Sequence, residues 1–87
     1  MTKKELKKRI LDCEDAIVTY RSQNSGKLKY NVVTLNLYTE YIRNKKNKSK
    51  EEEDTLLVFC WDTDSYRLLK PELVTHVVPL SAVLKGR

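Results

Sequence analysis

The chain is poor in the side chains that build catalytic and metal sites. Its 87 residues include one histidine, His76, and two cysteines, Cys13 and Cys60. A nucleophile with its base, or a zinc centre, needs several such groups in one place. The carboxylates of Asp62 and Asp64 lie in a turn-forming cluster, where bonds to their own backbone explain them. We therefore expect no enzymatic activity and no catalytic residue, metal, cofactor or small-molecule substrate.

Glycine and proline are also scarce, with two of each in the chain. The glycines are Gly26 and Gly86, so a glycine-rich phosphate-binding loop is excluded. The two cysteines show no CxxC spacing, and each falls within an apolar pattern. This favours free buried thiols in a reducing compartment over a disulfide or a metal site.

Long hydrophobic runs are missing as well. No run approaches the ~20 apolar residues that a membrane span needs, and the lysine-rich N-terminus has no hydrophobic region of signal-peptide type. We expect an intracellular protein, in the cytoplasm, the nucleus or both, without a membrane partner. The length indicates one domain over residues 1–87. The net charge of +5 permits contact with RNA, DNA or an acidic protein without identifying any of them.

Three apolar segments stand out in the second half of the chain. Residues 55–62 include six consecutive apolar side chains, and we interpret this segment as a strand buried on both faces. A four-residue turn follows, so residues 66–69 return antiparallel to it. Pro71 then separates this second strand from residues 73–78, a third strand that is largely apolar on both faces. A strand of that kind at a sheet edge needs something to cover it.

The N-terminal part predicts a helix followed by a hairpin. Thr2 and Glu5 have the spacing of a capping box, in which each side chain bonds the backbone N–H of the other residue. Apolar residues then recur at three- and four-residue steps, so we expect a helix over residues 2–14. From residue 16 to residue 21 the period changes to two, and the polar run ending at Gly26 closes a hairpin.

The segment of residues 27–43 is rich in strand-forming residues, and it is too long to be an ordinary strand. The apolar phase reverses near residues 32–33, which predicts a bulge that bends the strand sharply. We expect Tyr38, Tyr41 and Ile42 to continue the strand beyond this bend. Long bent strands of this kind allow a small sheet to close on itself.

Two polar or terminal segments complete the chain. Residues 44–54 contain no apolar side chain and predict a solvated loop with a mobile tip. Its Lys45, Lys46, Lys48 and Lys50 could reach a nucleic-acid backbone, although the acidic half of the loop would repel phosphate. Residues 81–87 form a short tail that docks or continues into a partner. The whole order predicts a mainly β fold: a five-stranded, strongly bent antiparallel small barrel with a short N-terminal helix.

Two segments of the chain resemble the two motifs of the Sm and Sm-like family. Residues 31–38, Asn-Val-Val-Thr-Leu-Asn-Leu-Tyr, are similar to the first motif, and residues 68–78, Leu-Leu-Lys-Pro-Glu-Leu-Val-Thr-His-Val-Val, are similar to the second. Lys70 and Pro71 stand where RNA-binding members have Arg-Gly. The pattern is most similar to divergent members such as the Gemin-type subunits of the SMN complex, which assembles Sm cores on spliceosomal RNAs.

The resemblance implies a function and a set of residues. It implies a non-enzymatic subunit of a ribonucleoprotein-assembly complex, active in snRNP assembly for mRNA splicing, that pairs an edge strand with another Sm-like protein. RNA contact, indirect or weak, would involve Asn36 and Lys70, and Lys45 and Lys46 of the charged loop are separate candidates for it. The partner-binding residues would be those of the uncovered edge strand: Leu73, Val74, Thr75, His76, Val77 and Val78.

A second interpretation is a different small barrel, SH3-like or Tudor-like. Such a domain would bind a peptide or a nucleic acid through an exposed aromatic patch. The residues available for the patch are Trp61, Tyr38, Tyr41 and Tyr66. In the first interpretation, by contrast, Trp61 belongs to the core.

Overall fold

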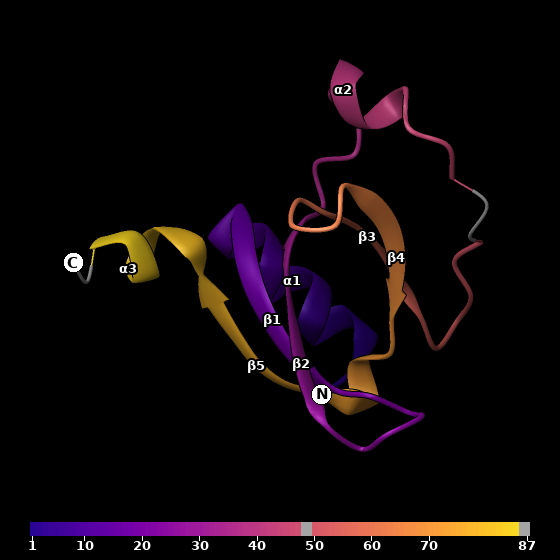
Figure 1. Cartoon of the computed structure of the whole chain (residues 1–87), viewed down its shortest axis with the longest axis vertical. Helices are drawn as coiled ribbons and strands as arrows, with labels where there is room; N and C mark the ends of the chain where they lie inside the picture. Colours follow the sequence, from indigo (N-terminus) through magenta and orange to yellow (C-terminus); the bar gives the residue numbers. More distant parts are fainter. Residues whose placement is uncertain (48–49, 86–87) are drawn as a thin grey trace.

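One antiparallel sheet dominates the computed structural model, which describes residues 1–47 and 50–85 (Figure 1). Its five strands lie in the order β4-β3-β2-β1-β5. Their bounds are β1 Asp15–Arg21, β2 Leu28–Thr34, β3 Leu56–Cys60, β4 Ser65–Leu69 and β5 Val74–Pro79. The helical elements are α1 Lys3–Cys13, α2 Glu40–Arg43, the 3-10 turn η1 Pro71–Leu73 and α3 Leu80–Lys85. The mainly β fold with an N-terminal helix is thus confirmed.

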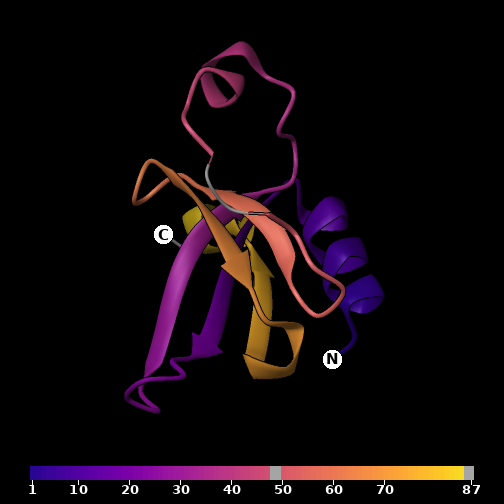
Figure 2. The same ribbon diagram turned by 90° about the vertical axis from the view of Figure 1, so that its right-hand side faces the viewer.

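The sheet is strongly curved, so that the β3–β4 hairpin crosses over β1 and β5 (Figure 2). Inside the curve lies a core to which all five strands contribute, with Val18, Val33, Val58, Leu69 and Val74 among its buried members. None of the described helices is both long enough and apolar enough to cross a membrane.

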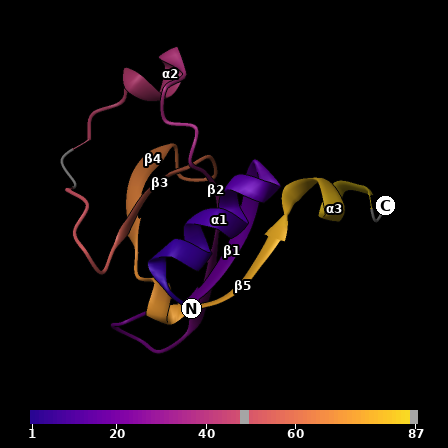
Figure 3. The ribbon, with the colours of Figure 1, turned by 180° about the vertical axis from the view of Figure 1, so that it is seen from behind.

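Helix α1 lies across the sheet and closes the core from one side (Figure 3). Its Leu6 and Ile10, four residues apart, are completely buried. The Glu5 N–H donates to Thr2 Oγ1 at 3.1 Å, as the capping box predicts. The reciprocal bond differs from the prediction, because Glu5 Oε1 accepts from the Thr2 hydroxyl at 3.0 Å.

The prediction of a long bent strand over residues 27–43 is wrong. β2 pairs with β1 over its whole length without a shift in register, so there is no bulge near residues 32–33. The sheet irregularity lies instead between Thr19 and Tyr20, where β1 meets β5. β2 ends at Thr34, whose hydroxyl accepts the Asn36 N–H at 3.1 Å and turns the chain out of the sheet.

Helix α2 takes the place of the expected strand continuation. It contains Tyr41 and the fully buried Ile42. The apolar spacing that suggested a strand is therefore satisfied by one short helical turn that packs beside the β3–β4 hairpin. The Tyr66 hydroxyl fastens it by donating to the Ile42 carbonyl at 2.9 Å.

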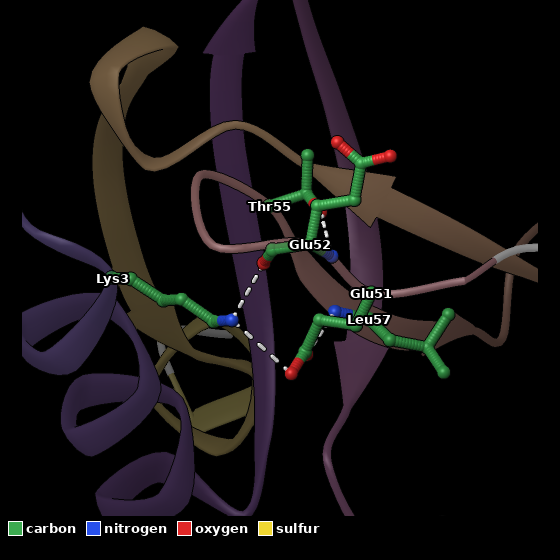
Figure 4. Close-up of polar contacts among 5 residues, drawn as sticks. All are labelled: Lys3, Glu51, Glu52, Thr55 and Leu57. Carbon is green, nitrogen blue, oxygen red and sulfur yellow. Dashed lines mark hydrogen bonds and ion pairs between the residues drawn. The ribbon is translucent and has the colours of Figure 1, made fainter.

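The loop after α2 is anchored at its acidic end (Figure 4). Lys3 Nζ lies 3.2 Å from a Glu51 carboxylate oxygen and donates to the Glu52 carbonyl at 2.8 Å. Glu51 also accepts the Leu57 N–H at 2.8 Å, and this bond is the main reason why its pKa lies below the usual value. The acidic half is therefore tied to α1 and β3. The tip that was expected to be mobile includes residues 48–49, which lie outside the described part.

Two further expectations need correction at the C-terminal end. Residues 81–85 of the predicted tail belong to helix α3, and residues 86–87 lie outside the described residues. Leu73 lies in η1 rather than in the strand, because Pro71 begins a 3-10 turn whose Leu73 N–H bonds the Lys70 carbonyl at 2.9 Å. Both Cys13 and Cys60 are free thiols, as predicted, but only Cys60 is buried and Cys13 is half-buried. Burial raises the pKa of Cys60 to about 11.

Candidate functional site

The outer edge of β5 is open. β5 pairs with β1 on one side, and within residues 1–47 and 50–85 no strand pairs with its other side. The opposite edge of the sheet is formed by β4. An unpaired edge presents backbone N–H and C=O groups to any strand that can lie beside it.

The predicted partner-binding residues divide between the core and the solvent. Val74 is buried and Val77 is half-buried against the core, so both support the fold. Thr75 and His76 are exposed and share a hydrogen bond of 2.9 Å between Thr75 Oγ1 and His76 Nδ1. Val78, 40% exposed, is an apolar side chain left uncovered on this strand.

Helix α3 carries further exposed apolar side chains, close in sequence to this edge. It follows β5 directly and projects from the body of the molecule (Figure 1). Its Val83 and Leu84 are exposed, as is Val78. The spacing of Leu80, Val83 and Leu84 is helical, and that pattern in the sequence could have revealed the helix. We call Val78, Val83 and Leu84 the edge patch.

The four residues predicted to contact RNA do not form one site. Asn36 lies beside Trp61 in a groove near the end of α1. Lys45 is paired with Asp64 at 2.7 Å and lies 4.6 Å from the centre of the Tyr41 ring. This bond raises the pKa of Lys45 and lowers that of Asp64. Lys46 is exposed, and only Lys70 lies in a basic surrounding.

That basic surrounding is a cleft of about 250 Å³ near the β1–β2 hairpin. Within the described part of the chain, its four basic residues form no ion pair with a carboxylate. We call it the basic cleft; its charged residues are Arg21, Lys29, Arg67 and Lys70. Sequence reasoning found only Lys70, because the other three come from three different strands or strand ends.

A polar network that includes the buried Asn31 positions Arg67 in this cleft. Arg67 donates to the Tyr20 hydroxyl at 2.8 Å, and Tyr20 donates to Asn31 Oδ1 at 2.6 Å. Asn31 is only 5% exposed, and its amide donates to Asp62 Oδ2 at 3.0 Å. Asp62 Oδ1 accepts the Val32 N–H at 3.2 Å, so this carboxylate bonds β2 and not its own turn as expected.

Three of the four predicted patch aromatics gather around the buried Phe59. Tyr41 stacks on Trp61 with ring centres 6.3 Å apart. Phe59 meets Trp61 and Tyr66 edge-on, at 5.2 and 5.5 Å. Trp61 is 42% exposed, so it lies at the margin of this cluster rather than within the core. Tyr38, at 85% exposure, stands apart.

Comparison with protein-family models, with curated proteins and with solved structures found no match to this chain. Its function must therefore be inferred from its own geometry and chemistry.

Proposed function

We propose that the chain is a non-enzymatic, Sm-like assembly subunit that pairs its β5 edge with a strand of another Sm-like protein. The observation that carries the proposal is the unpaired outer edge of β5, together with the exposed apolar side chains of the edge patch on β5 and α3. A partner strand would complete the backbone hydrogen-bond ladder, and its side chains would cover Val78, Val83 and Leu84.

The expected energetics agree with such a contact. Ladder bonds give register and direction, and each contributes about 0.5–1.5 kcal/mol net. Covering the edge patch adds ~25 cal/mol for each Å² of apolar surface removed from water. Because an 87-residue domain has a small core, a partner also stabilises the fold by binding only the native state.

The similarity of residues 31–38 and 68–78 to the Sm motifs suggests the setting. In this proposal the partner is another Sm-like protein within a ribonucleoprotein-assembly complex of the SMN type, which acts in snRNP assembly and splicing. Such a role places the protein in the cytoplasm, the nucleus or both. Asn31 of the first motif is itself buried and donates its amide to Asp62, so it acts in folding rather than in binding.

Molar mass in solution tests the proposal. Light scattering after size exclusion, with the chain alone and mixed with candidate Sm-like subunits, is expected to show a mixed complex at micromolar concentration. The same mixture with a Val78→Asp, Leu84→Asp variant should show weaker association, because the charges would be buried at the interface. If no Sm-like subunit changes the elution or mass of the chain at about 100 μM, well above typical micromolar dissociation constants, the proposal is wrong.

Direct RNA contact is a second candidate function, and the basic cleft favours it. Four cationic side chains without carboxylate partners within the described chain attract phosphate. We expect weak binding of a single-stranded oligouridine that falls steeply with salt. Replacing Lys70 with glutamine should lower the slope of log K against log salt by about 1.

The matched control for this measurement is Lys8→Gln, which removes one exposed charge from α1, outside the basic cleft. Fluorescence anisotropy at several salt concentrations gives both slopes. Equal slopes for Lys70→Gln and Lys8→Gln would show that RNA responds to overall charge and not to the basic cleft.

A further inference from the structure

A second groove, of about 590 Å³, lies where α1 ends and β1 begins. Its walls come from α1, from the chain after β2 and from the residue after β3. Two apolar, two aromatic and two acidic side chains are among those that line it: Leu11, Leu35, Tyr38, Trp61, Glu14 and Asp15. We call it the aromatic–acidic groove.

Trp61, one of the two aromatic residues that line the groove, is held in place by three neighbouring side chains. The Trp61 indole N–H donates to Asp15 Oδ1 at 3.0 Å, which fixes the ring against β1. The ring also stacks on Tyr41 at 25° between planes and receives Phe59 edge-on. Trp61 keeps 42% of its surface exposed although it is held on these sides, so a rigid aromatic surface remains available to a ligand.

The charge of the groove is negative in a chain that is positive overall. Glu14 and Asp15 line it, and no described lysine or arginine does, although the sequence has 17 basic residues. The C-terminal end of α1 points here and has no basic residue in its last turn, so the negative end of the helix dipole adds to the carboxylates. The described residues contain no group of carboxylates suited to a metal ion.

We propose that the aromatic–acidic groove binds an arginine or lysine side chain of a basic segment in a partner polypeptide. The cationic head would lie against Trp61 and Tyr38 and near the carboxylate of Glu14, while its alkyl stem would cover Leu11 and Leu35. Nucleic acid is disfavoured because the carboxylates repel phosphate. The groove volume exceeds the needs of one small amine, which favours a peptide segment. This site does not depend on β5 pairing.

Trp61 provides the measurement, because it is the single tryptophan of the chain. Its emission is followed while the intact protein is titrated with a blocked hexa-arginine peptide and, separately, with hexa-citrulline, which has the same shape without the charge. We expect hexa-arginine to change the emission saturably and hexa-citrulline to bind about tenfold more weakly, a loss in the range for removing charge from a hydrogen-bonded cation. Absence of a saturable change, or equal binding of the two peptides, would overturn the proposal.

Two variants separate the groove from general charge attraction. Tyr38→Ala should weaken hexa-arginine binding about threefold through the lost cation–π contact, and Glu14→Gln should weaken it about twofold. Tyr30→Ala and Glu72→Gln are the matched controls, because both residues are exposed and neither lines the groove. Circular dichroism verifies that all four variants are folded. If the groove variants bind like the controls, the peptide is not held in the groove.

Discussion

The Val77→Pro variant is expected to lose association with an Sm-like partner while it remains folded. Proline has no backbone N–H, so it removes one donor from the ladder that a partner strand would form with β5. The loss of that bond, together with the bulk of the ring at the strand edge, should weaken association by about 3 kcal/mol, roughly 100-fold.

The direction of the Val77 N–H follows from the register of β5. β5 pairs Pro79 with Ala16 and Val77 with Val18. Because Pro79 has no N–H, it cannot exchange both ladder bonds with Ala16. The Pro79–Ala16 pair is therefore a non-hydrogen-bonded pair. Hydrogen-bonded and non-hydrogen-bonded pairs alternate along an antiparallel ladder, so the Val77–Val18 pair, two positions away, is also non-hydrogen-bonded. We infer that its N–H points away from β1, toward the open edge.

The control for this experiment is Val77→Ala, which shortens the side chain and keeps the N–H. Surface plasmon resonance with the partner identified by molar mass should give near-native affinity for Val77→Ala and an affinity roughly 100-fold weaker for Val77→Pro. A folded Val77→Pro variant that binds with native affinity would show that the β5 edge is not the interface.

The Phe59→Ala variant is expected to lose about 3–5 kcal/mol of the free energy of unfolding. Phe59 is completely buried and meets Tyr41, Trp61 and Tyr66. Its removal leaves a cavity and also deprives α2 of the ring that Tyr41 packs against. Since a domain of this size has a total stability of only about 5–15 kcal/mol, the variant should be partly unfolded at 37 °C.

Urea denaturation followed by Trp61 emission and by circular dichroism measures this loss. Tyr38→Ala is the matched aromatic control, and it should change the stability by less than about 0.5 kcal/mol because Tyr38 is 85% exposed. A loss below about 1 kcal/mol for Phe59→Ala, a typical value for an arbitrary substitution, would mean that the aromatic cluster is not a structural unit.

The strands after residue 55 were predictable because each is defined by local chemistry. β3 is a continuous apolar run, and the turn-forming cluster Asp62-Thr63-Asp64-Ser65 permits only a tight antiparallel return. The end of β2 was not predictable in this way. Tyr41 and Ile42 fit a strand and a helix equally well, and packing beside the β3–β4 hairpin decides in favour of α2.

The candidate sites likewise differ in whether they could be predicted from the sequence. The open edge of β5 could be predicted, because the sequence shows that β5 is the last strand of the chain and that a proline ends it. The basic cleft and the aromatic–acidic groove could not, because their residues come together only through strand register and the position of α1. Trp61, for example, reaches Asp15 across 46 positions of sequence.

The anchoring of the loop between α2 and β3 makes it a suitable place for a label. Lys45 fastens one end to Asp64, and Glu51 fastens the other to Lys3 and Leu57. The entropy of closing a loop rises only slowly with its length. A tag inserted directly after Lys46, which is exposed and lines neither the basic cleft nor the aromatic–acidic groove, is therefore expected to leave the fold intact.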